Sequence, residues 1–339
     1  MKKEDKLKPL KQTFWEIFTA APHRMMFFAG AVQLFLPLLF WSAELFGRHT
    51  DLWAPLDTII SITWAHGFIM LYGVFSFFIF GFLMTVYPRW MNGELVPKVA
   101  YISTFAWLCF GMLLFQIGIF FNITLAAIGV AIFLLGWATG QIALYKVYKM
   151  APTRNKNYET ILNFALAAGW IGSGSFLLWL LTDNWHYLTF SLHAGLWIFL
   201  LPILFSVAHR MIPFFSSSII RGYRNYQPMW TLKIMLASCI GHLIMETMQL
   251  TQWLFIADIP LAYVAILHSI KWQPIKSFTD RLLAVLHMAF LWLGLGMLLF
   301  SIQSLYFLFS GELILAKGPL HSITIGFFTS LLIAMASRV

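Results

Sequence analysis

The stretch Trp64-Ala-His-Gly-Phe-Ile-Met-Leu-Tyr-Gly-Val-Phe-Ser-Phe-Phe-Ile-Phe-Gly-Phe-Leu-Met-Thr85 decides the fold. It contains no Asp, Glu, Lys or Arg, and it is as long as the ~20 residues that a helix needs to cross the hydrocarbon core of a bilayer. The stretch therefore predicts a transmembrane helix with a histidine, His66, inside it.

The whole chain has the composition of an integral membrane protein. Hydrophobic residues make up 60% of it and charged residues 10%, and its mean hydropathy is +0.79, which lies outside the range of soluble domains. We predict an all-α polytopic bundle of about ten transmembrane helices. The predicted spans are residues 25–46, 59–86, 99–120, 122–146, 160–182, 186–209, 228–248, 250–270, 282–309 and 318–337.

The basic residues predict the orientation of the bundle. Twenty of the 22 lysines and arginines fall in the N-terminal segment, the even-numbered loops or the C-terminus, which leaves Arg48 and Lys317 on the other side. By the positive-inside rule both termini are cytoplasmic, as in a multi-pass protein of a bacterial inner membrane. The net charge of +9 is then explained by topology and anionic lipid, so no nucleic-acid partner is expected.

Two parts of the chain are distinguished. Residues 1–24 are a basic segment, either an amphipathic helix on the inner leaflet or a solvated tail, and residues 25–339 are a single transmembrane domain. Cys109 and Cys239 are far apart in sequence and predict neither a disulfide nor a cysteine metal site.

Three histidines recur at almost equal intervals, near the predicted outer ends of spans two, six and ten. His66 and His193 are 127 residues apart, and His193 and His321 are 128 apart. The interval suits a block of four membrane helices and predicts pseudo-threefold units over roughly 25–150, 151–275 and 276–339, the last one incomplete. His242, followed one turn later by Glu246, lies toward the same side in span seven.

Histidines inside a membrane bind metals or haem, or they simply form hydrogen bonds between helices. Imidazole suits iron, copper and zinc. Glycines next to the repeated histidines, Gly67, Gly195 and Gly326, would let a flat macrocycle approach the backbone. By contrast, His209 and His268 lie beside basic residues at the predicted cytoplasmic ends, where an interfacial position is expected.

Several motifs resemble those of the NnrS family. They are Ala21-Pro-His-Arg24, then His66-Gly-Phe68 through Gly81-Phe-Leu-Met-Thr85 to Pro88-Arg-Trp90, and Leu320-His-Ser-Ile-Thr-Ile-Gly326 through Met335-Ala-Ser-Arg-Val339. The resemblance implies a polytopic cytoplasmic-membrane protein that contains haem, of the b type, and copper. It also implies a role in nitric oxide metabolism and in tolerance of nitrosative stress.

That family is in turn distantly similar to the catalytic subunit of haem-copper oxidases and nitric oxide reductases, which has twelve helices in three arcs and ligand histidines on helices two, six, seven and ten. By this likeness His66 and His321 are axial haem ligands, His193 and His242 bind copper or a second metal, and Glu246 orients His242. The chain departs from the pattern because spans seven and ten each carry one histidine where the oxidases carry a pair. The pattern would also place two more helices after the tenth, as expected for a truncated or naturally short member.

Three functions remain open at this point. The first is a haem or haem-copper protein that binds, senses or consumes nitric oxide, which as an enzyme would be an oxidoreductase with an unidentified electron donor. The second is a secondary transporter, and the third is a structural membrane protein without a redox cofactor.

Overall fold

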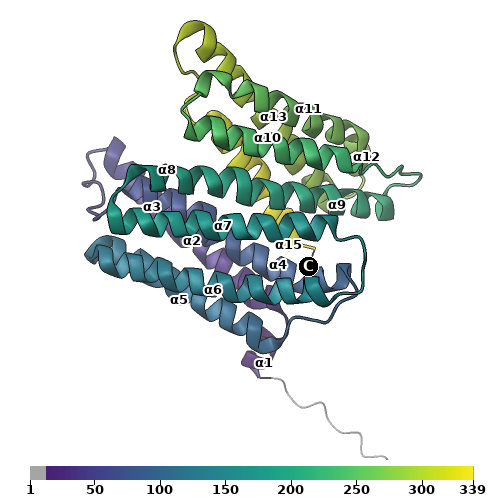
Figure 1. Cartoon of the computed structure of the whole chain (residues 1–339), viewed down its shortest axis with the longest axis horizontal. Coiled ribbons are helices and arrows are strands. Elements are labelled where there is room, and N and C mark those ends of the chain that lie inside the picture. The colour runs from purple at the N-terminus through teal and green to yellow at the C-terminus, as the bar shows by residue number, and fades with distance from the viewer. Residues whose placement is uncertain (1–12, 339) are drawn as a thin grey trace, which may run out of the picture.

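The computed structural model describes residues 13–338, and every regular element in that part of the chain is a helix (Figure 1). The predicted all-α class is confirmed. Ten long helical segments occupy the ten predicted spans. In chain order they are α2 (Pro22–His49), α3–η1–α4 (Ile62–Trp90), α5 (Lys98–Phe121), α6 (Ile123–Met150), α7 (Asn157–Thr182), α8–η2–α9 (Trp185–Ile219), α10 (Met229–Thr247), α11 (Phe255–Lys271), α13 (Arg281–Ser310) and α14–η4–α15 (Gly318–Ala336).

Nine of these segments, among the described residues, are long and apolar enough to cross a membrane. The exception is α10, which carries Lys233, His242 and Glu246. It is still part of the bundle, because it packs against α11 and along the sixth segment. The chain is therefore a polytopic helical membrane protein.

Spans two, six and ten share a feature that the sequence did not predict. Each begins as an α-helix, widens into a π-helical segment and, after it, becomes α-helical again. The π segment starts within three residues of the repeated histidine in every case, and π-helical turns are rare and concentrate at functional sites. In span two, η1 (Ile69–Val74) lies between α3 (Ile62–Phe68) and α4 (Phe75–Trp90). In span six, η2 (Gly195–Leu200) lies between α8 (Trp185–Ala194) and α9 (Leu201–Ile219). In span ten, η4 (Ser322–Thr329) lies between α14 (Gly318–His321) and α15 (Ser330–Ala336).

The hairpin of α5 and α6 shows how local sequence sets the packing. Asn122 alone separates the helices, and its side chain accepts a hydrogen bond from the Thr124 amide at 2.7 Å, which caps α6. A Cβ atom on Gly111 would lie 2.3 Å from the Phe133 nitrogen, and one on Gly129 would lie 2.3 Å from the Phe115 nitrogen. Only glycine permits this approach of two backbones, a common basis of helix packing in membranes.

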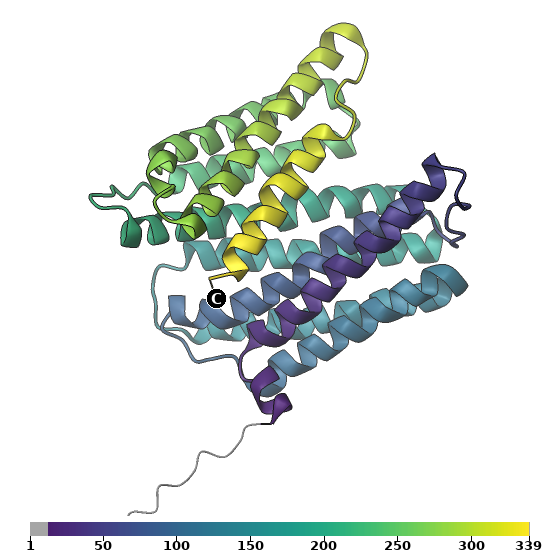
Figure 2. The same ribbon diagram turned by 180° about the vertical axis from the view of Figure 1, so that it is seen from behind.

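The segments stack side by side with their axes roughly parallel (Figure 1). The last segment, yellow in the reverse view, lies between the green helices α10, α11 and α13 and the purple and blue helices α2 and α4 (Figure 2). It packs mainly on α13 and also touches α4 through α15. Large apolar side chains cover the outward faces, for example Phe28, Phe164 and Tyr263, as expected of surfaces in contact with lipid.

The described part of the N-terminal segment contains one short helix, α1 (Phe14–Phe18). Thr13 and Glu16 form a reciprocal capping box at its start. Phe18 packs edge-on against Phe28 and Phe105, which attaches α1 to the bundle. Residues 1–12, which belong to the predicted basic segment, lie outside the described residues.

Candidate functional site

His66 lies at the predicted outer end of span two and stacks on Trp41 of α2. The two ring centroids are 4.2 Å apart and the planes differ by 15°. Arg48 also contacts Trp41, with its guanidinium 5.5 Å from the ring centroid. The Arg48 Nε donates a hydrogen bond to Glu44 at 2.6 Å. Within the described residues no hydrogen bond reaches either nitrogen of the His66 ring, so this imidazole is held by stacking and keeps its nitrogens free.

His321 ends α14, at the same end of the bundle. Its Nδ1 lies 2.9 Å from the carbonyl oxygen of Lys317, one turn earlier. An Nδ1–H donated to a backbone carbonyl leaves Nε2 with its lone pair, which is the usual arrangement of a metal-binding histidine. The His321 side chain is exposed, and like His66 it lies near the start of its span. The structure therefore places these two predicted residues at the same end of the bundle.

His193 and His242 are linked by a shared carboxylate. Glu246 places Oε2 3.7 Å from His193 Nε2 and Oε1 3.3 Å from His242 Nε2. The residues come from α8 and α10, which pack against each other. The structure thus joins the second pair of predicted residues with Glu246.

A further residue completes this group and was not assigned from the sequence. Asp258 of α11 is fully buried and lies 2.5 Å from His242 Nδ1. Trp197 stacks on the same imidazole with ring centroids 3.5 Å apart. Both nitrogens of His242 therefore face carboxylates. The sequence signal was weak, because the acid comes sixteen residues after the histidine and on the next helix.

No cluster of three or more His, Cys, Asp or Glu side chains in the described part of the chain is placed so that it could hold a metal ion. His193, His242 and Glu246 are neighbours, yet they do not converge on one point.

Tyr72, in the π segment after His66, connects spans two and six. Its hydroxyl donates to the carbonyl oxygen of Ser191, two residues before His193, at 2.7 Å. The side chain is fully buried and runs so close to two helices that only glycine fits opposite it. A Cβ atom on Gly172 would lie 2.2 Å from the hydroxyl oxygen, and one on Gly195 2.8 Å from it.

The glycines beside the histidines do not form a cradle for a macrocycle, contrary to the expectation from the sequence. A Cβ atom on Gly67 would meet Leu192 at 3.0 Å, and one on Gly326 would meet the Trp292 ring at 2.7 Å. Side chains of neighbouring helices occupy the space beside Gly67 and Gly326, and the Tyr72 ring occupies the space beside Gly195. That expectation is wrong because close helix packing uses glycine for the same geometric reason that a flat ligand would.

A second polar cluster lies at the opposite end, the predicted cytoplasmic end. His209 and His268 are both fully buried, so the expectation that they face the headgroup interface is wrong. Arg210 binds the buried Glu159 at 2.6 Å and lies over the Trp90 ring at 4.4 Å. The Arg210 side chain is 27% exposed, whereas its histidine neighbour is buried.

The two exit arginines repeat one interaction. Arg210 follows His193 by seventeen residues and pairs with an acid at the start of the preceding span. Arg338 follows His321 by the same interval and pairs with Asp280, which caps α13, at 3.3 Å. The spacing of the arginines was visible in the sequence, whereas their acidic partners, 51 and 58 residues away, were not.

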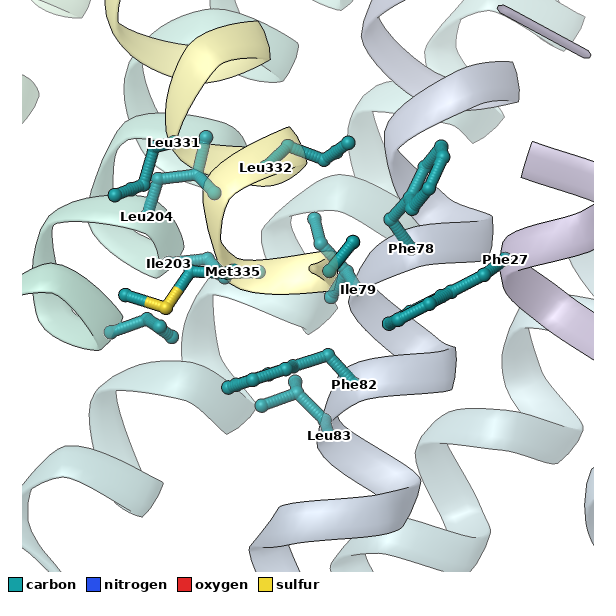
Figure 3. Close-up of a pocket in the computed structure, with 12 residues that line it drawn as sticks. Phe27, Phe78, Ile79, Phe82, Leu83, Ile203, Leu204, Leu331, Leu332 and Met335 are labelled. Atoms are coloured by element: carbon teal, nitrogen blue, oxygen red, sulfur yellow. The ribbon is translucent and has the colours of Figure 1, made fainter. Parts of the chain in front are cut away.

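A small apolar pocket opens where α2, α4, α9 and α15 meet (Figure 3). Its volume is about 40 Å³, and its walls carry only apolar side chains, among them Phe27, Phe82, Leu204 and Met335. The pocket includes none of the predicted ligand residues.

The helices and the two polar clusters define a polytopic helical membrane protein with histidines buried at both ends of the bundle. Comparison with known families identifies it further. The family described as NnrS protein matches residues 17–339, and the chain belongs to this family. No curated protein matches the chain. The family membership fits a membrane protein connected with nitric oxide.

Proposed function

We propose that the chain is a haem protein that binds nitric oxide, with His66 and His321 as the haem ligands. The observation that carries the proposal is the presence of two imidazoles with available nitrogens at the same end of the bundle. His66 stacks on Trp41 without a hydrogen bond to either nitrogen within the described residues, and His321 has its Nδ1 bound to a backbone carbonyl. Histidine is a common axial ligand of haem iron.

The surrounding residues have distinct tasks in this proposal. Trp41 holds the plane of His66, and Arg48 with Glu44 fixes Trp41 from the solvent side. Lys317 is exposed at the same end and supplies a positive charge for the propionates of a haem. Haem bound there would supply an iron that changes oxidation state, and nitric oxide would bind it in place of one of the two histidines.

We also propose His193 and His242 as ligands of copper or another second metal. Imidazole nitrogens suit copper, iron and zinc, and two histidines with one carboxylate are typical of non-haem iron. Glu246 already touches both imidazoles, and Asp258 fixes His242 from its other nitrogen in the way that carboxylates orient metal-binding histidines.

The orientation of the bundle belongs to the same proposal. The distribution of basic residues supports an orientation in which both termini lie in the cytoplasm of a bacterial cell and the histidines lie near the outer surface of the inner membrane. A reporter that is active only in the periplasm would then be active when fused to residue 312, between α13 and α14. A reporter that is active only in the cytoplasm would be inactive there. Activity of a cytoplasmic reporter at this position would reverse the orientation.

Nitric oxide binding to the detergent-purified, dithionite-reduced protein tests the function. We expect a haem absorption band that shifts when nitric oxide is added, in the wild type and equally in a His186→Ala control, since His186 is exposed at the start of α8. A haem band that nitric oxide leaves unchanged would contradict nitric oxide as the ligand. No haem band after haem supplementation would favour a transporter or a structural protein.

A further inference from the structure

A groove of about 690 Å³ lies between α6 and α7, which are neighbours in the bundle (Figure 1). Its volume falls within the range of small-molecule sites, about 300–1,000 Å³. Five of the large apolar side chains that line it are exposed, namely Ile142, Tyr145, Phe164, Trp170 and Ile171. The groove therefore opens sideways, toward the lipid that surrounds a membrane-spanning bundle.

Hydrogen bonds between the two helices mark both ends of the groove. Near the middle of the helices, the Trp170 indole N–H donates to the Leu134 carbonyl oxygen at 3.0 Å. At the predicted cytoplasmic end, the Tyr148 and Thr160 hydroxyls are 3.0 Å apart. Thr160 and Ile171 both line the groove, and at ~1.5 Å per residue they are about 16 Å apart along α7. One leaflet contributes ~15 Å of hydrocarbon to the bilayer, so the groove is about as long as one leaflet is deep.

The groove is polar at one end and apolar at the other. Tyr148, Thr160 and Asn163 line its predicted cytoplasmic end, whereas Ala138 and Ile171 line the end near the middle of the bilayer. A molecule that fits has a polar head at the membrane surface and an apolar chain that runs inward. A phospholipid of the adjacent leaflet has this form.

Basic residues are concentrated at the polar end. Among the described residues, those in the last turns of α6 and in the connection to α7 form no ion pair with an acid. They are Lys146, Lys149, Arg154 and Lys156. The acid at the start of α7, Glu159, is already bound to Arg210 at 2.6 Å. The positive charge at this end of the groove is therefore available to an anion.

Two of these lysines are best placed to bind a phosphate. The Lys156 ammonium donates to the Tyr148 carbonyl oxygen and lies 5.1 Å from the Tyr148 ring centroid, which holds it at the mouth of the groove. An ammonium carries three N–H donors, so two remain. Lys149 is exposed and follows the lining residue Tyr145 by four positions, which puts both on one face of α6.

We infer that the groove between α6 and α7 binds an anionic phospholipid, with an acyl chain along the groove and the phosphate at Lys149 and Lys156. Basic residues next to a membrane strengthen the binding of anionic lipid by about fivefold each, the equivalent of ~1 kcal/mol. A zwitterionic lipid gains little from them because its net charge is zero. The groove lies at the end of the bundle opposite the proposed haem ligands, so the inference does not rest on the proposed function.

Native mass spectrometry of the full-length protein, purified and delipidated in detergent, tests the inference. The probe is an equimolar mixture of dioleoylphosphatidylglycerol and dioleoylphosphatidylcholine, which differ only in the headgroup. We expect the wild type to retain one phosphatidylglycerol in preference to phosphatidylcholine. Replacing Lys149 and Lys156 together with glutamine should lower that preference roughly 25-fold.

The double variant of Lys271→Gln and Lys276→Gln is the matched control. Both lysines are exposed at the same predicted end of the bundle, and neither lines the groove. The control loses the same charge and should keep the wild-type preference. An equal loss in both double variants would mean that the lipid responds only to net charge, and it would overturn the site.

Ala138→Phe tests the acyl chain, because it fills the apolar end of the groove and leaves every basic residue in place. We expect this variant to lose the retained lipid, whereas undiminished retention would show that only a phosphate is bound at the surface and would overturn the inference. If the variants do not fold, the wild type still decides. Phosphatidylglycerol must raise its melting temperature more than phosphatidylcholine does, and equal effects of the two lipids would overturn the site. Haem absorbance plays no part in these readouts.

Discussion

Gly172→Ala tests how closely spans two and six are joined through Tyr72. A Cβ atom at residue 172 would lie 2.2 Å from the Tyr72 hydroxyl oxygen and 3.2 Å from its Cζ. The hydroxyl is overlapped by about 1 Å, whereas the ring carbon is only slightly too close. Overpacking of this kind costs about 1–3 kcal/mol, and the hydroxyl cannot move away without losing its bond to the Ser191 carbonyl, worth about 1 kcal/mol.

Tyr72→Phe removes the overlapping atom and should therefore rescue Gly172→Ala. We expect Tyr72→Phe alone to cost about 1 kcal/mol. Gly172→Ala should cost less than about 1 kcal/mol when it is introduced into the Tyr72→Phe variant. The coupling energy between the two sites is then about 1–2 kcal/mol, within the range seen for residues in contact. Thermal unfolding of the detergent-solubilised protein measures it as apparent melting temperatures of the four proteins.

Gly174→Ala is the matched control on the same helix, because a Cβ atom there would have nothing within 4 Å. Alanine favours a helix over glycine by up to about 1 kcal/mol, so this variant should melt at or above the wild-type temperature. Equal tolerance of Gly172→Ala and Gly174→Ala, or strictly additive effects of Gly172→Ala and Tyr72→Phe, would refute the reasoning.

Three further substitutions probe the ion pairs and the buried acid, all by thermal unfolding. Arg210→Ala should cost about 3–5 kcal/mol because it leaves a buried carboxylate unpaired, and a loss under about 1 kcal/mol would show that the pair is solvated. Arg338→Ala should cost no more than about 1 kcal/mol, since its partner Asp280 is 40% exposed; a loss as large as that of Arg210→Ala would contradict this ranking. Asp258→Ala should cost about 1–3 kcal/mol by leaving a buried nitrogen of His242 unpaired, and an unchanged melting temperature would argue against that contact.

Nine of the ten segments in the described part of the chain were predictable because each is a long apolar run, and the length of a spanning helix is set by the bilayer. The grouping of His193 with His242 and Glu246 was also expected. The equal spacing of the histidines reflects a repeated helix pattern, and His242 and Glu246 are one turn apart.

The π segments and the buried acids could not be read from the sequence. These π segments, of 6, 6 and 8 residues, are too short to show a hydrophobic period that would distinguish them from an α-helix. Asp258 and Glu159 have partners on other helices, so only the fold reveals which histidine or arginine each one meets. His209 was misplaced for a related reason, because the Arg210 side chain beside it is partly exposed while the imidazole is buried.

The absorption spectrum of the purified protein tests the haem site most directly. It is recorded in the oxidised and dithionite-reduced states for the wild type, His66→Ala, His321→Ala and the exposed control His186→Ala. A haem held by two histidines predicts a b-type spectrum in the wild type and in His186→Ala. It predicts loss of the haem, or conversion to a high-spin spectrum, in both His66→Ala and His321→Ala. A wild-type spectrum in either of these two variants, in well-folded protein, would contradict the assignment of its histidine as a ligand.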